Sequence, residues 1–214
     1  SLCLVGSEMC IRDRCRAHTP IPILGKMFRY LASQTKTNIC CHVDHGYTLD
    51  ECYEGIDSGF TSVMFDGSKL TLKENIKISK KIASRAHKYN ISIEGEIGFV
   101  GYDNGKISEG TNIEDAVTFA NKSNIDAMAI SVGNTHLQTS KKASIDFNKI
   151  NLIEAKTKIP LVLHGSSGIP VEQRKKLARK TKVAKLNIGT EIRMTFGEAC
   201  LLYTSDAADE RSGV

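Results

Sequence analysis

Histidines and carboxylates gather at the ends of apolar runs in this chain. In the segment HVDHG, His42 and Asp44 share one face of an expected strand, and His45 lies past its end. His136 and His164 each end another apolar run. Any one of these histidines could be structural, but imidazole nitrogens suit Zn²⁺, and a neighbouring carboxylate can move a proton on a bound substrate. Taken together, they predict three imidazoles converging on one catalytic zinc.

Two turns built from small residues follow the last two apolar runs. Such turns let backbone N–H groups face an anion, and Ser or Thr hydroxyls add further donors. In eight-stranded barrels, the loops after the seventh and eighth strands often hold phosphate. We therefore predict phosphate-binding segments at Gly165, Ser166 and Ser167, and at Asn187, Ile188, Gly189 and Thr190.

Three further carboxylates, Asp66, Glu94 and Glu96, lie on or just after expected strands. Strand alternation places Glu94 and Glu96 on one face, which we expect to be the interior of the barrel. Buried carboxylates need a cation or hydrogen-bond donors. These residues are therefore candidates for support of the metal ligands, for an alternative metal position, or for a structural salt bridge.

Strand-like runs alternate with amphipathic segments along the chain. Six runs begin near residues 38, 61, 92, 127, 160 and 184. Three of the intervening helices should begin with capping boxes, at Thr48, Thr71 and Thr111, each with Glu three residues later. This alternation predicts parallel strands joined by right-handed crossovers, with the polar residues meeting at the carboxyl ends of the strands.

The fold class expected from this pattern is α/β, a (β/α)8 TIM barrel with about six of its eight βα units present. The stretch 20–35 resembles a helix that should follow an earlier strand, which indicates that two strands are missing from the front. Segments 1–14 and 200–214 lack βα periodicity and resemble translated sequencing-adapter DNA, the alternative being genuine disordered tails. The predicted domain is therefore 15–199.

Composition limits the classes of function. The 214 residues, 41% of them hydrophobic, can form one sizeable core. The formal charge of +5 is spread over Lys-rich helix faces, which indicates a solvated surface or attraction of an anionic substrate. No membrane span and no basic–aromatic pattern for nucleic acid is visible. The seven Cys lack zinc-finger spacing, so we expect reduced thiols and a cytoplasmic location.

Between about residues 20 and 199, the chain resembles class II, metal-dependent fructose-bisphosphate or tagatose-bisphosphate aldolases. The segments HVDHG, GFTSVMFDGS, KENI, PLVLHGSSGIP and KLNIGTE carry the resemblance. It implies an eight-stranded barrel with one zinc on His45, His136 and His164, and Asp44 as the proton-transferring residue. It also implies cleavage of a ketose 1,6-bisphosphate to dihydroxyacetone phosphate and glyceraldehyde 3-phosphate, a monovalent cation near the phosphate, and a homo-oligomer, either a dimer or a tetramer.

Two positions depart from the family pattern. Leu137 stands where the family has Gly after the second zinc histidine. The loop Gly98–Gly105 is short, and Asp103 is its candidate acidic residue. Three alternatives therefore stay open: an aldolase for fructose bisphosphate, one for tagatose bisphosphate or another ketose phosphate, and a catalytically silent barrel that binds sugar phosphates. With two strands missing, we expect the chain alone to be poorly stable and inactive.

Overall fold

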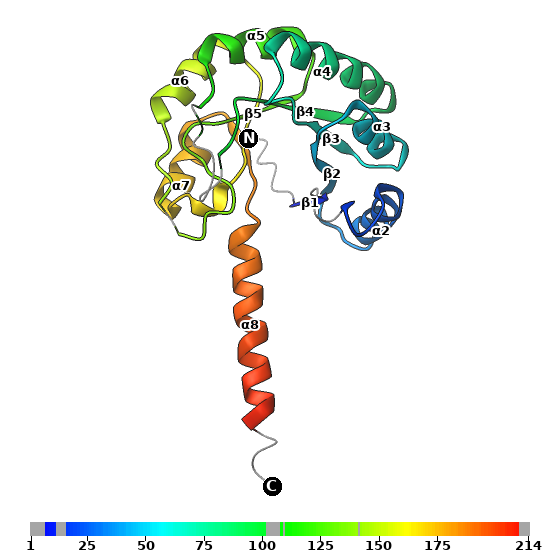
Figure 1. The fold of residues 1–214 in the computed structure, drawn as a ribbon, viewed down its shortest axis with the longest axis vertical. Coiled ribbons are helices and arrows are strands. Elements are labelled where there is room, and N and C mark those ends of the chain that lie inside the picture. The colour runs from blue at the N-terminus through cyan, green and yellow to red at the C-terminus, as the bar shows by residue number, and fades with distance from the viewer. Residues whose placement is uncertain (1–6, 12–15, 102–107, 109, 141, 210–214) are drawn as a thin grey trace.

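The structure is a computed structural model that describes residues 7–11, 16–101, 108, 110–140 and 142–209. Parallel strands in chain order form one curved sheet, and helices cover its convex face (Figure 1). Each strand pairs with the next along the chain, which is the arrangement expected of successive βα units. The strands are β1 (Ser7–Ile11), β2 (Ile39–Gly46), β3 (Ser62–Phe65), β4 (Ser92–Ile97), β5 (Ala127–Ile130), β6 (Leu161–Leu163) and β7 (Val183–Leu186).

A helix follows each of these strands, and the last helix extends away from the sheet (Figure 1). Among the described residues, none of the helices combines the length and apolar character needed to cross a membrane. The helices are α2 (Ile21–Ser33), α3 (Leu49–Asp57), α4 (Leu72–Ala86), α5 (Ile113–Ser123), α6 (Phe147–Lys156), α7 (Val171–Lys180) and α8 (Thr190–Asp209), with 3₁₀ turns η1 (His87–Tyr89) and η2 (Ser166–Gly168).

The α/β class and all six expected strands are confirmed. The parallel sheet curves into part of a barrel, as an incomplete TIM barrel would, while the full count of eight units stays a prediction. One expectation is wrong: the segment 1–14 was assigned no part in the sheet, yet Ser7–Ile11 forms β1 and pairs in parallel with β2. Its short SEMCI stretch gives little apolar signal, and the pairing uses backbone groups that any sequence carries. The domain limits and the adapter-like origin of both ends stay predictions.

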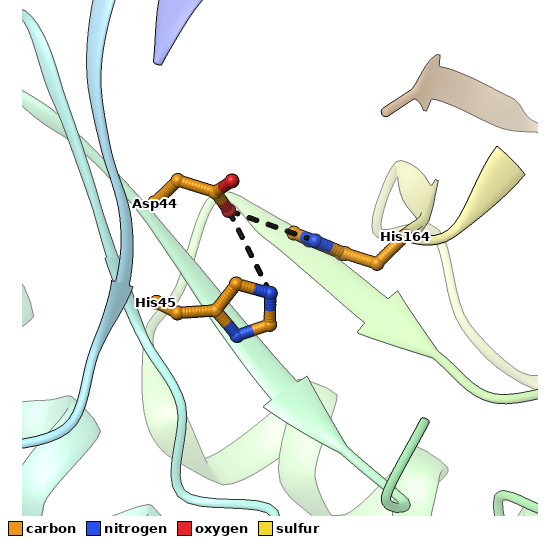
Figure 2. Close-up of side chains that lie close together, drawn as sticks. All are labelled: Asp44, His45 and His164. Atoms are coloured by element: carbon orange, nitrogen blue, oxygen red, sulfur yellow. Dashed lines mark ion pairs between the residues drawn. The ribbon is translucent and has the colours of Figure 1, made fainter. Parts of the chain in front are cut away.

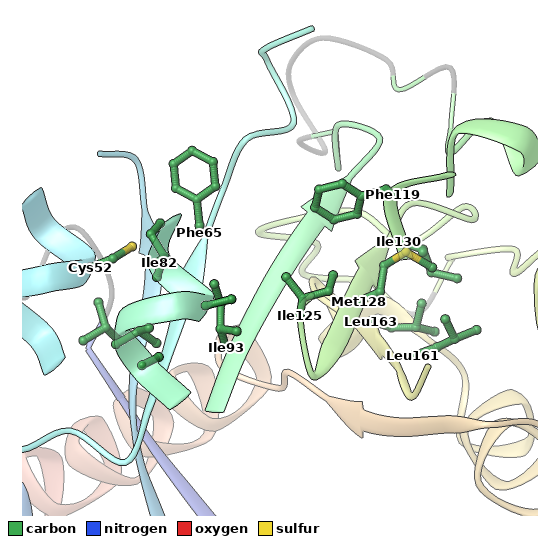
Figure 3. Packing of buried hydrophobic residues seen from close by; sticks show 14 of the residues in the cluster. Cys52, Phe65, Ile82, Ile93, Phe119, Ile125, Met128, Ile130, Leu161 and Leu163 are labelled. Atoms are coloured by element: carbon green, nitrogen blue, oxygen red, sulfur yellow. The ribbon is translucent and has the colours of Figure 1, made fainter. Parts of the chain in front are cut away.

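The sheet divides the apolar residues into two clusters. The larger one lies between the sheet and the helices and includes Phe65, Ile93, Phe119 and Met128 (Figure 3). The smaller one, on the concave side, consists of Met64, Ala129 and Val162, with Ala127 packed against it. Because strand side chains alternate, the polar residues between the outward apolar ones also face the concave side. The fold therefore collects its histidines and carboxylates inside the curve.

The helix starts agree with two of the three expected capping boxes. Thr48 and Thr71 cap α3 and α4, with Glu51 and Glu74 reaching back. The third assignment is wrong, because the cap of α5 is Asn112, which accepts from the Asp115 N–H. The neighbouring Thr111 is buried, and its hydroxyl donates to the Ile97 carbonyl at 2.7 Å and accepts from the Ser131 N–H at 2.7 Å. Thr111 therefore joins the ends of β4 and β5.

Candidate active site

The three histidines expected to bind a metal converge on the concave side of the sheet. Ring centroids are 4.7 Å apart for His45 and His164, 5.3 Å for His45 and His136, and 6.1 Å for His136 and His164. All three side chains are buried. They come from the end of β2 and from the segments after β5 and β6, so parallel strand ends do bring them together.

The backbone at His45 explains how neighbours in sequence face the same site. In a regular strand, Asp44 and His45 would lie on opposite faces. His45 instead has a φ of 55°, in the left-handed region, and the β2–β3 register shifts between Val43 and Gly46. The Arg16 guanidinium fixes this turn by donating to the carbonyls of Asp44 at 2.7 Å and His45 at 2.8 Å. Both side chains consequently point toward the same centre, where they meet His164 (Figure 2).

Two of the three histidines, His45 and His164, each donate a hydrogen bond from one ring nitrogen to a carboxylate. His45 Nδ1 donates to Asp66 Oδ2 at 2.8 Å, and His164 Nε2 donates to Glu94 Oε1 at 2.7 Å. A carboxylate accepts only, so each contact fixes which nitrogen carries the proton of the neutral ring and reserves the other nitrogen for a metal, which must displace any proton held there. Of the roles left open for Asp66 and Glu94, these contacts favour support of the metal ligands.

Asp44 faces both His45 and His164. Its Oδ1 is 3.8 Å from His45 Nε2 and 3.6 Å from His164 Nδ1 (Figure 2). One ligand atom from each of these residues lies within 4.8 Å of the others, and such a set could hold a metal ion. The His136 ring packs beside this set, but its ligand atoms lie outside that limit.

A second set of potential ligands shares His45 with the first. It consists of His45, Asp66 and Glu96, and Glu96 Oε2 is 3.7 Å from His45 Nδ1. Within the described part of the chain, buried His45 Nε2 and Glu96 Oε2 have no hydrogen-bond partner. Buried polar atoms of this kind are costly unless something satisfies them. The lone pairs of an imidazole nitrogen and of a carboxylate oxygen are both suitable ligands, so these two atoms fit a bound cation at this centre.

The charges around the centre shift several pKa values. Burial alone would lower the pKa of His45, but the hydrogen bond to Asp66 and the charges of Asp44 and Glu96 raise it to about 9. Burial opposes ionisation of Asp66, yet its contact with His45 lowers the Asp66 pKa to about 2. Burial, and then the charge of Asp66, raises the pKa of Glu96 well above its usual value. The cluster thus has an excess of negative charge that a cation would balance.

The two predicted phosphate-binding segments lie side by side. Ser166 N–H donates to the Asn187 carbonyl at 3.0 Å, and Glu191 N–H donates to Ser167 Oγ at 3.2 Å. Ser166 Oγ donates to the Leu163 carbonyl, so this hydroxyl holds the turn together. Gly165 has a φ of 64°, and a Cβ there would collide with the Thr135 carbonyl. Of the remaining predicted residues, Ile188 and Gly189 precede α8, and Thr190 is its first residue.

Of the two positions that depart from the family pattern, the structure describes Leu137. Leu137 has a φ of 57° and is 39% exposed, so the position does require the left-handed conformation that Gly adopts easily. Asp103 lies outside the described residues.

Three supporting residues were not identified from the sequence. Arg16 contacts the turn at His45, and Lys185 Nζ lies 2.6 Å from Glu94 Oε2. Asn134 donates to the His164 carbonyl at 2.9 Å. Lys185 had a usable signal, because strand alternation places it on the same face as Asn187. Arg16 stands apart from every motif, so only the fold reveals its contact.

The chain was compared with protein families and curated relatives. Residues 9–213 match the family model described as fructose-bisphosphate aldolase class-II. A 6-phospho-5-dehydro-2-deoxy-D-gluconate aldolase of Shouchella clausii is 40% identical over 76% of the chain and 56% of its own length. A fructose-bisphosphate aldolase of Ureaplasma parvum is 38% identical over 81% of the chain and 60% of its own length. The chain thus spans little more than half the length of these relatives.

Solved structures share the fold. The YdjI aldolase of Escherichia coli superimposes with a TM-score of 0.77 at 24% identity, over 94% of this chain and 71% of that one. A fructose-bisphosphate aldolase of Campylobacter jejuni gives a TM-score of 0.75 at 20% identity, over 95% and 70%. The family match along nearly the whole sequence shows that the chain belongs to the class II fructose-bisphosphate aldolase family.

Proposed function

We propose that the chain carries the active site of a zinc-dependent aldolase that reversibly cleaves a phosphorylated ketose. The observation that carries this proposal is the convergence of His45, His136 and His164 around Asp44 on the concave side of the sheet. Three imidazoles beside a carboxylate suit the open coordination shell of a catalytic metal.

His45, His136 and His164 would hold the metal, and their nitrogen donors favour Zn²⁺. When bound, the ion supplies a Lewis acid for the oxygen of the ketone. Asp66 and Glu94 orient the rings of His45 and His164 for this role.

Asp44 is the proposed proton-transferring residue. Its carboxylate faces both His45 and His164, so it lies beside the place that the reacting carbons would occupy. In cleavage it takes the proton of the hydroxyl β to the ketone, on C4 of fructose 1,6-bisphosphate. In condensation it returns that proton.

The adjoining turns at 165–168 and 187–190 would hold the phosphate next to the ketone. Their direct hydrogen bonds fix one turn against the other, and the N-terminus of α8 begins at Thr190. Backbone N–H groups at such a position favour an anion. Phosphate binding there would keep the ketone in register with the metal and Asp44.

Two substrates have specific support. The family description names fructose bisphosphate, whose cleavage gives dihydroxyacetone phosphate and glyceraldehyde 3-phosphate. Several relatives at 37–40% identity are named for 6-phospho-5-dehydro-2-deoxy-D-gluconate. Both compounds carry a ketone beside a phosphorylated carbon, so the metal, Asp44 and the phosphate turns would serve either one. They differ at the far end, which is a second phosphate in one and a carboxylate in the other.

Release of dihydroxyacetone phosphate from each substrate, with Zn²⁺ present, tests the proposal. Because the chain alone is expected to be inactive, the assay uses this chain extended to the full length of its relatives; we expect turnover of at least one substrate and a fall in kcat of about 10²–10⁴ for Asp44→Asn. Asp50→Asn, at an exposed position in α3, is the matched control and should leave kcat unchanged. Unchanged turnover in Asp44→Asn would overturn the proposal. Zinc binding without turnover of either substrate, or of tagatose 1,6-bisphosphate, would instead favour a silent sugar-phosphate-binding barrel.

A further inference from the structure

A polar network inside the curve of the sheet continues beyond the candidate metal ligands. Glu94, on β4, uses both carboxylate oxygens: Oε1 accepts from His164 Nε2 at 2.7 Å, and Oε2 lies 2.6 Å from Lys185 Nζ. Glu94 is 3% exposed and His164 1% exposed. One carboxylate thus bridges an ammonium from β7 and an imidazole from the end of β6.

This bridge fixes which nitrogen of His164 faces the metal centre. Because Glu94 Oε1 can only accept, the proton of the neutral ring sits on Nε2. The second contact agrees, since Asn187 Nδ2 donates to His164 Nδ1 at 3.1 Å in the metal-free chain, a donor whose place a metal would take. Nδ1, which carries the lone pair, is the nitrogen that lies 3.6 Å from Asp44 Oδ1.

Lys185 holds the Glu94 carboxylate in this orientation. A buried carboxylate with only one partner would be free to turn toward another donor, and His42 Nε2 lies 4.0 Å from Glu94 Oε2. His42 itself is held through Nδ1 to Ser62 Oγ at 2.8 Å, and its Nε2 is 3.5 Å from Lys185 Nζ. With Lys185 between His42 and Glu94, the carboxylate stays directed at His164.

We propose that Lys185 is a positioning residue that acts through Glu94 to present His164 Nδ1 to the metal. The proposal rests on the proposed function, in which His164 is a metal ligand. Lys185 itself touches neither metal nor substrate in this account. Its effect is therefore on metal affinity and on the tautomer of His164, and a merely structural lysine would change neither.

Zinc affinity, measured by competition with a chromophoric chelator, tests this role. Substitution of residues that orient metal ligands weakens metal binding about 10- to 100-fold. We expect a loss of that size for Lys185→Met and for Glu94→Gln. Lys175→Met is the matched control, because Lys175 is exposed and pairs with Glu172 on the same helix, far from the histidines. It should bind zinc as tightly as the unaltered chain.

A double-mutant cycle separates action through Glu94 from an independent effect. If Lys185 acts through Glu94, Lys185→Met should weaken zinc binding no further when Glu94→Gln is already present. Full additivity of the two losses, or a Lys185→Met variant with unaltered zinc affinity, would overturn the proposal.

The tautomer of His164 gives a readout that needs neither metal nor activity. In a long-range ¹H–¹⁵N spectrum of the metal-free chain labelled at histidine, His164 should carry its proton on Nε2. Lys185→Met should add a population protonated on Nδ1. Protonation of Nδ1 in the unaltered chain would contradict the proposal, even if the variant failed to fold. If the tautomers are as expected but the chain does not bind zinc, only the proposed function is contradicted.

Discussion

At the scale of single residues, the centre depends on a backbone conformation that few side chains adopt. The left-handed turn at His45 directs two consecutive side chains to the same face, and Arg16 stabilises that turn through two carbonyls. A non-glycine residue in this region costs about 1–3 kcal/mol and persists only where its surroundings hold it. The strain is thus located at the candidate active site.

The raised pKa of His45 predicts how the metal-free chain responds to pH. The pKa is about 9, against 6.5 for an unperturbed histidine, and Asp44, Asp66 and Glu96 face the ring. A group with a raised folded-state pKa adds stability below its unfolded value and loses it as pH rises through the folded value. Between pH 6.5 and 9, we expect the free energy of unfolding to fall by about 3 kcal/mol.

Urea unfolding across this pH range measures the effect. Glu96, whose pKa is also raised, acts in the same direction, so His45→Gln should reduce the slope without abolishing it. His87→Gln, at the exposed pair with Asp126, is the control and should keep the full slope. Stability that rises from pH 6.5 to 9 would contradict this account.

Leu137 should carry avoidable strain. Its φ of 57° is unfavourable for a side chain but free of cost for glycine. Leu137→Gly is therefore expected to raise the free energy of unfolding by up to about 1 kcal/mol. Leu152→Gly, at an exposed leucine inside α6, should lower it by a similar amount. Equal losses from both substitutions in urea unfolding would refute the role given to strain at Leu137.

At the scale of elements, the threonine before α5 provides a direct test of the corrected helix start. Thr111→Val keeps the shape but removes both hydrogen bonds to the backbone of Ile97 and Ser131. We expect a loss of about 2 kcal/mol, because two buried backbone groups lose their partner. Asn112→Ala should cost about 1 kcal/mol as the loss of a cap. If thermal and urea unfolding show no effect of Asn112→Ala, the assignment of Asn112 as the cap of α5 is contradicted, and the capping box predicted at Thr111 is favoured again.

The elements also show what the sequence could and could not predict. Six strands were recognisable because each is an apolar run that ends in polar residues, and an apolar run of this length indicates a buried strand. β1 lacks that pattern and owes its place to backbone pairing with β2. The convergence of His136 and His164 with His45 followed from strand ends meeting at one edge. Strand alternation could have placed Lys185 on the face of Asn187, but its contact with Glu94 and the contact of Arg16 with the turn at His45 depend on how far separate strands curve, which no local pattern encodes.

At the scale of the whole molecule, α8 presents apolar side chains to water. It extends from the sheet (Figure 1), and Ile192, Phe196, Leu201, Leu202 and Tyr203 are each more than 60% exposed. Exposed apolar surface of this extent favours association. The homo-oligomer thus stays a prediction, and α8 is the surface through which we expect it to form. The cytoplasmic location and the absence of membrane and nucleic-acid partners also stay predictions.

Sedimentation velocity tests association through α8. We expect the average mass to rise with concentration for the unaltered chain, and the double variant Phe196→Lys with Leu202→Lys to shift it toward the monomer. Glu198→Lys changes the charge at an exposed polar position of the same helix and should leave association intact. A chain that is monomeric at every concentration would disprove this prediction.

The central claim, that the three histidines form one metal centre, is tested most directly by titrating the metal-free chain with Zn²⁺. We predict saturable binding of one ion per chain, with protons released as the metal replaces the proton on His45. His164→Ala should weaken binding strongly, and His87→Ala should leave it unchanged. Absence of saturable zinc binding in a folded chain, or equal affinity in the chain carrying His164→Ala, would contradict the account.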